Sequence, residues 1–224
     1  MTLIDNLIQE KYLKTDNIIK AFREIKRKDF LPEKIKDLDE QNTALPISHN
    51  QTNSQPLTVA FMLELLQPKP GEKILDIGSG SGWTTALLAK IVSDPHSLLS
   101  PPPPIGRGRA GGGGKVIAIE IIPELVEFGK KNILRYNFIN KGVVEFICAN
   151  GVKGHKEQAP YDKILASASG KEIPESWKQQ LKIGGRIVAP VKNSILLLIK
   201  QGKNNFKRIK YPGFVFVPLV DKKL

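Results

Sequence analysis

The sequence predicts an α/β fold in which a mostly parallel sheet carries helices on both faces. From about residue 57 to residue 191, short apolar runs alternate with helical patterns, and parallel strands need such crossovers. A glycine-rich stretch joins the first apolar run to the helix that follows it. After residue 192, two runs flank a turn of glycine and asparagine, which is typical of an antiparallel hairpin.

The first 40 residues carry apolar side chains at helical spacing, which predicts a helical N-terminal extension. Asp16 is expected to cap the second helix of this extension. Residues 41–56 hold many amides, hydroxyls and turn formers, and they predict a loop on the surface. The next helix is expected over residues 57–66, because Pro68 follows it.

The core is expected to alternate strands and helices in chain order. Strands are predicted at residues 73–77, 116–119, 143–149, 163–166 and 186–191. Helices are predicted at residues 83–92, 123–136 and 174–181. The hairpin should use residues 195–200 and 206–210, and residues 214–217 predict one further strand.

Residues 93–114 interrupt this alternation. They include four consecutive prolines at 101–104 and four consecutive glycines at 111–114. Prolines favour an extended chain and glycines a flexible coil, so the segment cannot bury a core. We predict a disordered, exposed insertion between the first core helix and the second strand. A proline-rich docking site, or an arginine contact to a polyanion, is the alternative.

The composition excludes several classes of protein. Apolar residues make up 41% of the 224 residues, which suits the core of one domain, and no apolar run approaches the roughly 20 residues of a membrane span. No basic stretch precedes an apolar one at the start, so a signal peptide is not expected. The single cysteine, Cys148, leaves no intramolecular disulfide and no cysteine-rich zinc site. We therefore expect a soluble cytoplasmic protein.

The formal net charge is +12, which raises the question of an acidic partner. The densest basic clusters are Lys26-Arg27-Lys28 and Lys207-Arg208 with Lys210. Neither cluster is interleaved with aromatic residues, as a groove for single-stranded nucleic acid would be. We interpret the charge as solvated surface charge, with a dedicated nucleic-acid patch as the alternative. The three histidines show no metal-ligand spacing, so no metal site is expected.

The strongest motif joins the first core strand to its helix and consists of Asp76-Ile77-Gly78-Ser79-Gly80-Ser81-Gly82. Glycines there permit positive φ and let a ligand approach the main chain, while the helix directs its N-terminus at the same place. Dinucleotide-binding folds space these glycines as G-x-G-x-x-G. Here the third glycine comes one position early and Trp83 replaces a small residue, which argues against a pyrophosphate site. A glycine turn without a ligand is the alternative.

A nucleotide-type ligand also needs a carboxylate for its ribose hydroxyls. This acid usually ends the second strand, about 20 residues after the glycine loop. Glu120 ends the second predicted strand but lies 42 positions after Gly78, and removing the 22 residues 93–114 shortens that interval to 20. The insertion therefore explains the spacing, and Glu120 is the predicted ribose ligand. A surface glutamate at a strand end is the alternative.

Together these residues resemble a class I S-adenosylmethionine-dependent methyltransferase with a Rossmann-like sheet. Further blocks are similar, in the right order, to the protein-L-isoaspartate (D-aspartate) O-methyltransferase family. In the N-terminal part these blocks are residues 21–32, Leu45-Pro46-Ile47 and residues 51–56. In the later part they are Ala159-Pro160-Tyr161-Asp162, Ile173-Pro174, residues 180–186 and Val217-Pro218-Leu219. Apart from the insertion, the likeness covers nearly the whole chain.

The resemblance implies roles for the matching positions. Ser54 and Thr52 match active-site residues, and peptide-binding positions are matched by Gln51, Asn53, Val217, Pro218 and Leu219. Contacts to S-adenosylmethionine are implied for Asp76, Gly78, Ser79, Gly80, Gly82, Glu120, Asn150 and Gly151. One methyltransferase domain would then comprise a helical segment with a substrate loop (1–56), a cofactor-binding core (57–192) and C-terminal strands (193–224).

Four positions depart from the family pattern. Ser48 and Asn50 replace glycines, Asn53 replaces a small apolar residue, and Asn150 replaces an aspartate that binds the adenine amino group. Asparagine can still accept a hydrogen bond but carries no charge, so we expect weaker cofactor binding.

The implied reaction is methyl transfer to the α-carboxylate of L-isoaspartyl or D-aspartyl residues in damaged proteins, which starts repair through a succinimide. A carboxylate has an unperturbed pKa near ~4, so it is ionised at neutral pH and can attack a sulfonium methyl without a general base. Thr52 and Ser54 would hold it by hydrogen bonds. The implied partners are isoaspartyl peptides and proteins. We expect a monomer without metal, membrane or specific nucleic-acid contacts.

Two other interpretations stay open. The first is a methyltransferase of the same fold that acts on RNA or a small molecule. Methyltransferases of nucleic-acid amino groups usually carry Asn/Asp-Pro-Pro-aromatic after the fourth strand, whereas this chain has Ala166-Ser167-Ala168-Ser169. The second is a non-catalytic module that binds a peptide or the cofactor, against which the intact glycine loop and Glu120 count.

Overall fold

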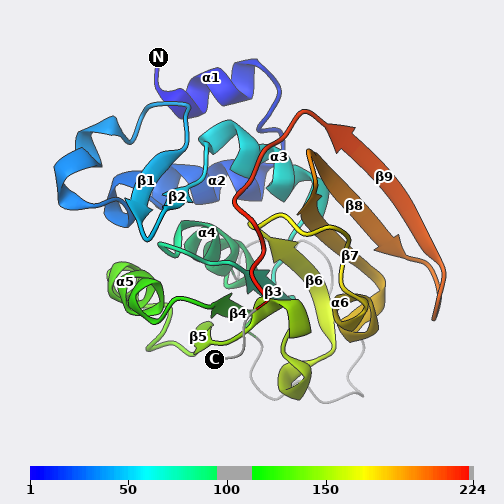
Figure 1. Cartoon of the computed structure of the whole chain (residues 1–224). Coiled ribbons are helices and arrows are strands. Elements are labelled where there is room, and N and C mark those ends of the chain that lie inside the picture. Colours follow the sequence, from blue (N-terminus) through cyan, green and yellow to red (C-terminus); the bar gives the residue numbers. More distant parts are fainter. Residues whose placement is uncertain (95–112, 222–224) are drawn as a thin grey trace.

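The computed structural model describes residues 1–94 and 113–221, and a seven-stranded sheet forms its centre (Figure 1). The strand order is β5-β4-β3-β6-β7-β8-β9. The strands are β3 (Lys73–Ile77), β4 (Lys115–Glu120), β5 (Val144–Cys148), β6 (Tyr161–Ala166), β7 (Leu181–Val191), β8 (Ser194–Lys200) and β9 (Phe206–Pro212). Strands β3 to β7 pair in parallel, and β8 pairs antiparallel with both β7 and β9. The predicted fold class is confirmed.

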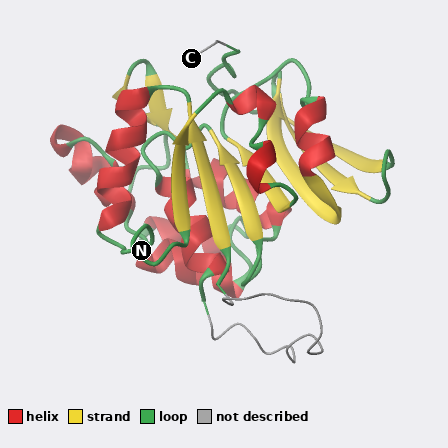
Figure 2. Cartoon of the chain, turned by 90° about the horizontal axis from the view of Figure 1, so that it is seen from below, coloured by secondary structure: helices red, strands yellow, loops and turns green. Residues whose placement is uncertain are grey.

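Helices cover both faces of this sheet (Figure 2). They are α1 (Leu3–Gln9), α2 (Asp16–Glu24), α3 (Pro56–Leu66), α4 (Trp83–Val92), α5 (Pro123–Leu134) and α6 (Glu175–Gln180), with 3-10 turns η1 (Arg27–Phe30), η2 (Glu33–Leu38), η4 (Gly151–Lys153) and η5 (Lys156–Gln158). On β3, Ile74 packs into the core beneath α2 to α4, and Leu75 packs into the core that holds Trp177 of α6. Neighbouring residues of a strand face opposite sides, so a doubly covered strand appears as a continuous apolar run.

The strand order creates a crevice at the carboxyl ends of the parallel strands. From β3, the chain adds β4 and β5 on one side of the sheet and then β6 and β7 on the other side. The order of the strands therefore reverses between β3 and β6. Ligands of open α/β sheets bind at such switch points, outside the carboxyl ends of the strands. The glycine loop follows β3 at this place.

Residues 41–56 were predicted as a surface loop, and this prediction is wrong in part. They contain the antiparallel strands β1 (Leu45–Ser48) and β2 (Gln51–Asn53). His49 and Asn50 join these strands with φ values of 52° and 54°, the positive angles of a two-residue hairpin turn. Strands of four and three residues are too short to give a periodic signal in the sequence.

Residues 214–217 do not form the predicted further strand. Gly213 has a φ of 94°, and it turns the chain away from the edge of the sheet. The carbonyl oxygen of Val217 accepts a hydrogen bond from the Ser169 N–H (2.8 Å), and the Leu219 N–H donates to the Ser169 carbonyl (2.9 Å). The apolar segment therefore pairs with the loop after β6, and Figure 1 shows it crossing the sheet near the end of β3.

Asp16 does not cap α2, as the sequence predicted, because it is the first residue within the helix. Thr15 is the N-cap residue. Its N–H and its hydroxyl donate to the carboxylate of Glu64 on α3, at 2.9 and 2.7 Å. A tertiary contact to α3 thus holds the start of α2.

The predicted disordered insertion, residues 93–114, lies mostly outside the described residues. At its two ends, Asp94 forms an ion pair with Lys20 (2.7 Å), and the Gly114 N–H donates to the carbonyl of Val92 (3.3 Å). These ends therefore lie against α2 and α4. No helix among residues 1–94 and 113–221 is long and apolar enough to cross a membrane.

Candidate active site

A cleft with a volume of about 670 Å³ opens at the carboxyl ends of β3, β4 and β6. Four stretches that lie far apart in the sequence form most of its wall, namely residues 51–55, 77–81, 119–123 and 215–220. The cleft thus joins the predicted cofactor residues to the predicted substrate residues. Most of the predicted site residues line it: Gln51, Thr52, Asn53, Ser54, Gly78, Ser79, Gly80, Glu120, Gly151, Val217, Pro218 and Leu219.

The glycine loop is held against the end of β4. The N–H groups of Gly78 and Ser79 both donate to the carbonyl of Ile119, at 2.8 and 3.1 Å. Gly78 and Gly80 have φ values of 74° and 52°, which favour glycine. Gly82 does not line the cleft, and a Cβ there would lie 3.2 Å from the carbonyl oxygen of Gly129. Gly82 therefore serves the packing of α4 on α5.

Glu120 ends β4 with a buried carboxylate that lies in the cleft wall. One oxygen accepts from the Gly80 N–H at 3.0 Å, and the other accepts from the N–H groups of Ile121 and Ile122, at 2.8 and 3.1 Å. A carboxylate has about four acceptor sites, so capacity remains for a ligand hydroxyl. Glu120 thus also fixes the glycine loop.

Asp76 lies beneath the cleft and is fully buried. One carboxylate oxygen accepts from the hydroxyls of Thr85 (2.6 Å) and Thr84 (3.3 Å), and the other has no hydrogen-bond partner. Burial raises the pKa of Asp76 from 3.8 to about 6, against the effect of the two hydroxyls, and the charge of Glu120 adds a little. The hydroxyl of Ser79, a residue of the cleft wall, is also buried without a partner.

The predicted substrate residues form two opposing walls. Thr52 is exposed and Ser54 half-buried on the β2 side. On the other side, Val217, Pro218 and Leu219 lie in the segment that crosses the sheet, where their main chain pairs with Ser169. A main-chain wall facing hydroxyl side chains suits a peptide ligand, because both offer hydrogen-bonding groups.

The family model of protein-L-isoaspartate(D-aspartate) O-methyltransferase (PCMT) matches residues 1–224. The chain belongs to this family.

Curated relatives carry the same family name. A protein-L-isoaspartate O-methyltransferase of Methanopyrus kandleri is 33% identical over 225 residues, which cover 99% of this chain and 91% of that protein. One of Methanococcus aeolicus is 37% identical over 222 residues, 98% of this chain and 93% of that protein. Among solved structures, the beta-aspartate methyltransferase of Plasmodium falciparum in complex with S-adenosyl-L-homocysteine has the same fold, with a TM-score of 0.80, 23% identity and coverage of 97% and 96%.

Asn150 lies outside the cleft of this family member. It borders a neighbouring recess, where its carbonyl oxygen accepts from the Val152 N–H at 3.0 Å and its amide group donates to Asp221 at 2.7 Å. Gly151 does line the cleft, and a Cβ there would come within 2.5 Å of Ile77. The Asn150 side chain is therefore already hydrogen-bonded to Val152 and Asp221. The predicted contact to adenine would have to be made by this same side chain.

The sequence did not indicate two features of this site. Arg27 belongs to a basic cluster that was interpreted as surface charge, yet it is buried at 5% exposure while Lys26 and Lys28 are exposed. Val215 is 86% exposed at the mouth of the cleft. The apolar pattern of residues 214–217 predicted a strand, so the exposure of Val215 could not be foreseen. Nothing local distinguishes Arg27 from its neighbours. Among the described residues, no group of three histidines, cysteines or acids could hold a metal ion.

Proposed function

We propose that this chain transfers a methyl group from S-adenosylmethionine to the α-carboxylate of L-isoaspartyl, and D-aspartyl, residues of damaged proteins. Membership of the PCMT family over residues 1–224 supports the reaction. The observation that carries the proposal is that one cleft is lined by the glycine loop, Glu120, residues 51–55 and residues 215–220. A donor site and an acceptor site that share one cleft suit a direct transfer.

The residues present fit the cofactor. The main chain of Gly78 to Gly80 can approach it closely, and Glu120 offers a carboxylate for the ribose hydroxyls. The buried Ser79 hydroxyl has no partner within the described protein, so a ligand could satisfy it. When bound, S-adenosylmethionine supplies a methyl group on a positively charged sulfur.

The chain itself needs to align the carboxylate and keep water away. An isoaspartyl carboxylate is ionised at neutral pH, so no general base is required. Thr52 and Ser54 would hold it by hydrogen bonds from the β2 side. The apolar side chains of residues 215–220 would cover the reacting atoms, and main-chain contacts there would recognise the altered backbone more than any side chain.

We also propose that the protein is a cytoplasmic monomer. The only cysteine, Cys148, is exposed and unpaired, which suits a reducing compartment. Among the described residues, the large exposed apolar side chains are Met1, Leu134, Ile183 and Val215, and they belong to separate elements. Light scattering during gel filtration measures the mass in solution.

Transfer of labelled methyl from S-adenosylmethionine to paired peptides, with aspartate or isoaspartate at one position, tests the reaction. We expect the isoaspartyl peptide to be labelled and the aspartyl peptide to stay unlabelled. Equal labelling, or none from a protein that binds the cofactor, would remove the isoaspartate assignment and favour an RNA or small-molecule acceptor or a non-catalytic role.

The variant Ser54→Ala tests the predicted active-site residue. It should lower kcat/KM for the isoaspartyl peptide about tenfold, since a hydrogen bond to a charged group contributes roughly 1.5 kcal/mol. The affinity for S-adenosylhomocysteine should change less than about twofold. Ser93→Ala, at the far end of α4, is the matched control. A loss confined to cofactor affinity would argue against this role of Ser54.

A further inference from the structure

Asn53 lies in β2 between the two predicted active-site residues, Thr52 and Ser54. Its side chain is 3% exposed. Burial of an amide in this way is unfavourable unless both of its ends find hydrogen-bond partners.

Both ends of the Asn53 amide have partners, and each partner belongs to a different part of the chain. The carbonyl oxygen accepts from Nε of Arg27 at 2.9 Å. The amide nitrogen donates to the hydroxyl of Ser81 at 3.0 Å. The charged donor on one side and the hydroxyl on the other fix which end of the amide faces which partner.

Arg27 ties this amide to the N-terminal segment. Its guanidinium donates to the carbonyl oxygens of Gln41 (2.8 Å), Thr43 (2.7 Å) and Ser54 (3.1 Å), and it lies over the ring of Trp83 at 5.4 Å. Burial lowers the pKa of Arg27 to about 10, so the group remains charged at neutral pH. The main chain around the β1–β2 hairpin is thus fixed to one cation.

Ser81 belongs to the glycine loop on the other side of the amide. It is buried and lines the cleft, and its carbonyl oxygen accepts from the Asn132 side chain on α5 at 3.0 Å. The neighbouring Gly80 N–H is held by Glu120 at 3.0 Å. A ligand that binds the glycine loop and Glu120 therefore acts on the main chain next to Ser81.

We propose that Asn53 is a positioning residue that couples the glycine loop to the β1–β2 hairpin, so that a bound cofactor orders the hairpin, which carries Thr52 and is followed by Ser54. This inference rests on the proposed function in naming the ligand of the glycine loop. The contact from Asn53 to Ser81 joins the two loops directly, side chain to side chain. Because coupling between two ligands is reciprocal, a bound peptide would raise cofactor affinity by the same factor.

Hydrogen exchange of the amides of residues 45–54, measured with and without saturating S-adenosylhomocysteine, tests this coupling without any substrate. In the unaltered protein we expect the ligand to slow exchange of these amides about tenfold. In Ser81→Ala, which removes only the hydroxyl that accepts from Asn53, the ligand should slow exchange less than about twofold. At saturating S-adenosylhomocysteine both proteins are fully occupied, so a weaker affinity of the variant does not affect the comparison of exchange rates.

Two further variants separate coupling from loss of structure. In Asn53→Asp, the carboxylate can still accept a hydrogen bond from Arg27, and the Ser81 hydroxyl can turn to donate one to it. The ligand should therefore slow exchange in this variant as much as in the unaltered protein. Ser194→Ala removes another buried serine hydroxyl on β8, away from the cleft, and should behave as the unaltered protein. Equal ligand-induced protection in Ser81→Ala and the unaltered protein, or none in either, would overturn the proposal.

Peptide affinity with and without S-adenosylhomocysteine gives the second readout. The ligand should lower the Kd of an isoaspartyl peptide several-fold in the unaltered protein and leave it nearly unchanged in Ser81→Ala. If the ligand protects residues 45–54 in the unaltered protein but no isoaspartyl peptide binds, the proposed substrate is wrong while the coupling stands. If the peptide is methylated yet Ser81→Ala keeps full protection, the coupling is wrong while the function stands.

Discussion

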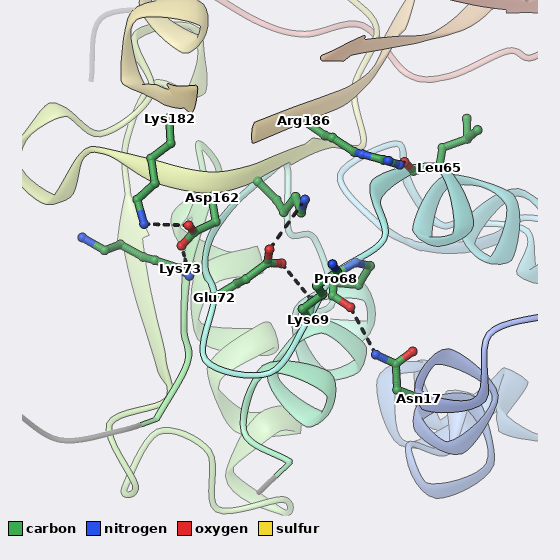
Figure 3. Close-up of polar contacts among 10 residues, drawn as sticks. Asn17, Leu65, Pro68, Lys69, Glu72, Lys73, Asp162, Lys182 and Arg186 are labelled. Carbon is green, nitrogen blue, oxygen red and sulfur yellow. Dashed lines mark hydrogen bonds and ion pairs between the residues drawn. The ribbon is translucent and has the colours of Figure 1, made fainter. Parts of the chain in front are cut away.

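The two ends of the parallel strands differ in how fully their buried polar groups are paired. At the amino ends, shown in Figure 3, charged side chains are paired with one another or with the main chain. Glu72 faces Lys163 at 3.6 Å, and Asp162 accepts from Lys182 at 2.6 Å and from the Lys73 N–H at 2.8 Å. Each carboxylate there has a cation or an N–H group within reach, so pairing offsets part of the cost of desolvation, although burial still raises the pKa of Glu72.

At the carboxyl ends, three buried polar atoms have no hydrogen-bond partner in the described protein, whereas beside the amino ends one such atom is found, Oδ1 of Asn17. The three are one carboxylate oxygen of Asp76, the hydroxyl of Ser79 and the indole nitrogen of Trp83, and they cluster around the glycine loop. Buried polar groups are rarely left unpaired, because each one costs about 1–3 kcal/mol. The contrast indicates that the amino ends serve stability and that the carboxyl ends give up stability for a ligand.

Breaking the pair at the amino ends should give the largest effect on stability. Lys163→Met leaves the mostly buried carboxylate of Glu72 without its cation, and we expect unfolding to become easier by about 2–3 kcal/mol. Burial already raises the pKa of Glu72. In the variant this carboxylate can take up a proton and become neutral, which limits the loss of stability. Urea unfolding measures stability, and calorimetry with S-adenosylhomocysteine should find its affinity unchanged.

The double variant Glu72→Met with Lys163→Met controls this prediction. Replacing both partners by apolar side chains removes the unpaired charge, so most of the lost stability should return. A double variant as unstable as Lys163→Met alone would show that packing of the lysine stem, and not pairing, is what the amino ends provide.

Glu120→Ala should produce the largest effect at the carboxyl ends. Loss of hydrogen bonds from ribose hydroxyls to a charged group should weaken S-adenosylhomocysteine binding by roughly 1.5–3 kcal/mol, about 10- to 150-fold. Glu120→Gln keeps the size but turns an NH₂ group toward a backbone N–H, so an intermediate loss is expected. Unchanged calorimetric affinity in both variants would remove Glu120 from the cofactor site.

Asp76→Asn should stabilise the fold at neutral pH. The pKa of Asp76 is about 6 in the folded chain against an ordinary value of 3.8, so protonation favours the folded state. Its stabilising contribution is complete below about pH 4 and is lost as the pH rises through 6. We expect a gain of about 1–2 kcal/mol at pH 7, reduced from the full linkage value because the new NH₂ group also lacks a partner.

The pH dependence is the decisive measurement for Asp76. Urea unfolding of both proteins between pH 4 and pH 8 should show the gain growing through pH 6 and nearly absent at pH 4. A variant that is less stable than the unaltered protein at every pH would mean that the carboxylate is a structural group like those at the amino ends.

Local sequence signals predicted the parts of the molecule whose structure is local. The helix over residues 83–92 matches α4 residue for residue, because a glycine loop bounds its start and apolar spacing runs through it. The β1–β2 hairpin escaped prediction because its strands are too short for a periodic signal and because the chain beside it is held by Arg27, whose partners lie 12 to 27 positions away. Residues 214–217 have the apolar composition of a strand, but their pairing partner is Ser169, which no local pattern reveals.

The smallest effect is expected from deleting residues 95–112, which joins Asp94 to Gly113. The two described ends of the deletion follow α4 and precede β4, at the amino ends of the strands. The Gly114 N–H already donates to the Val92 carbonyl at 3.3 Å, so the shortened connection has little distance to span. Shortening a loop changes its closure free energy only slightly, so the melting temperature should shift by no more than about 2 °C, with cofactor affinity unchanged. A large fall in melting temperature would show that the segment stabilises the amino ends. A fall in cofactor affinity alone would show that the two ends of the sheet are not independent.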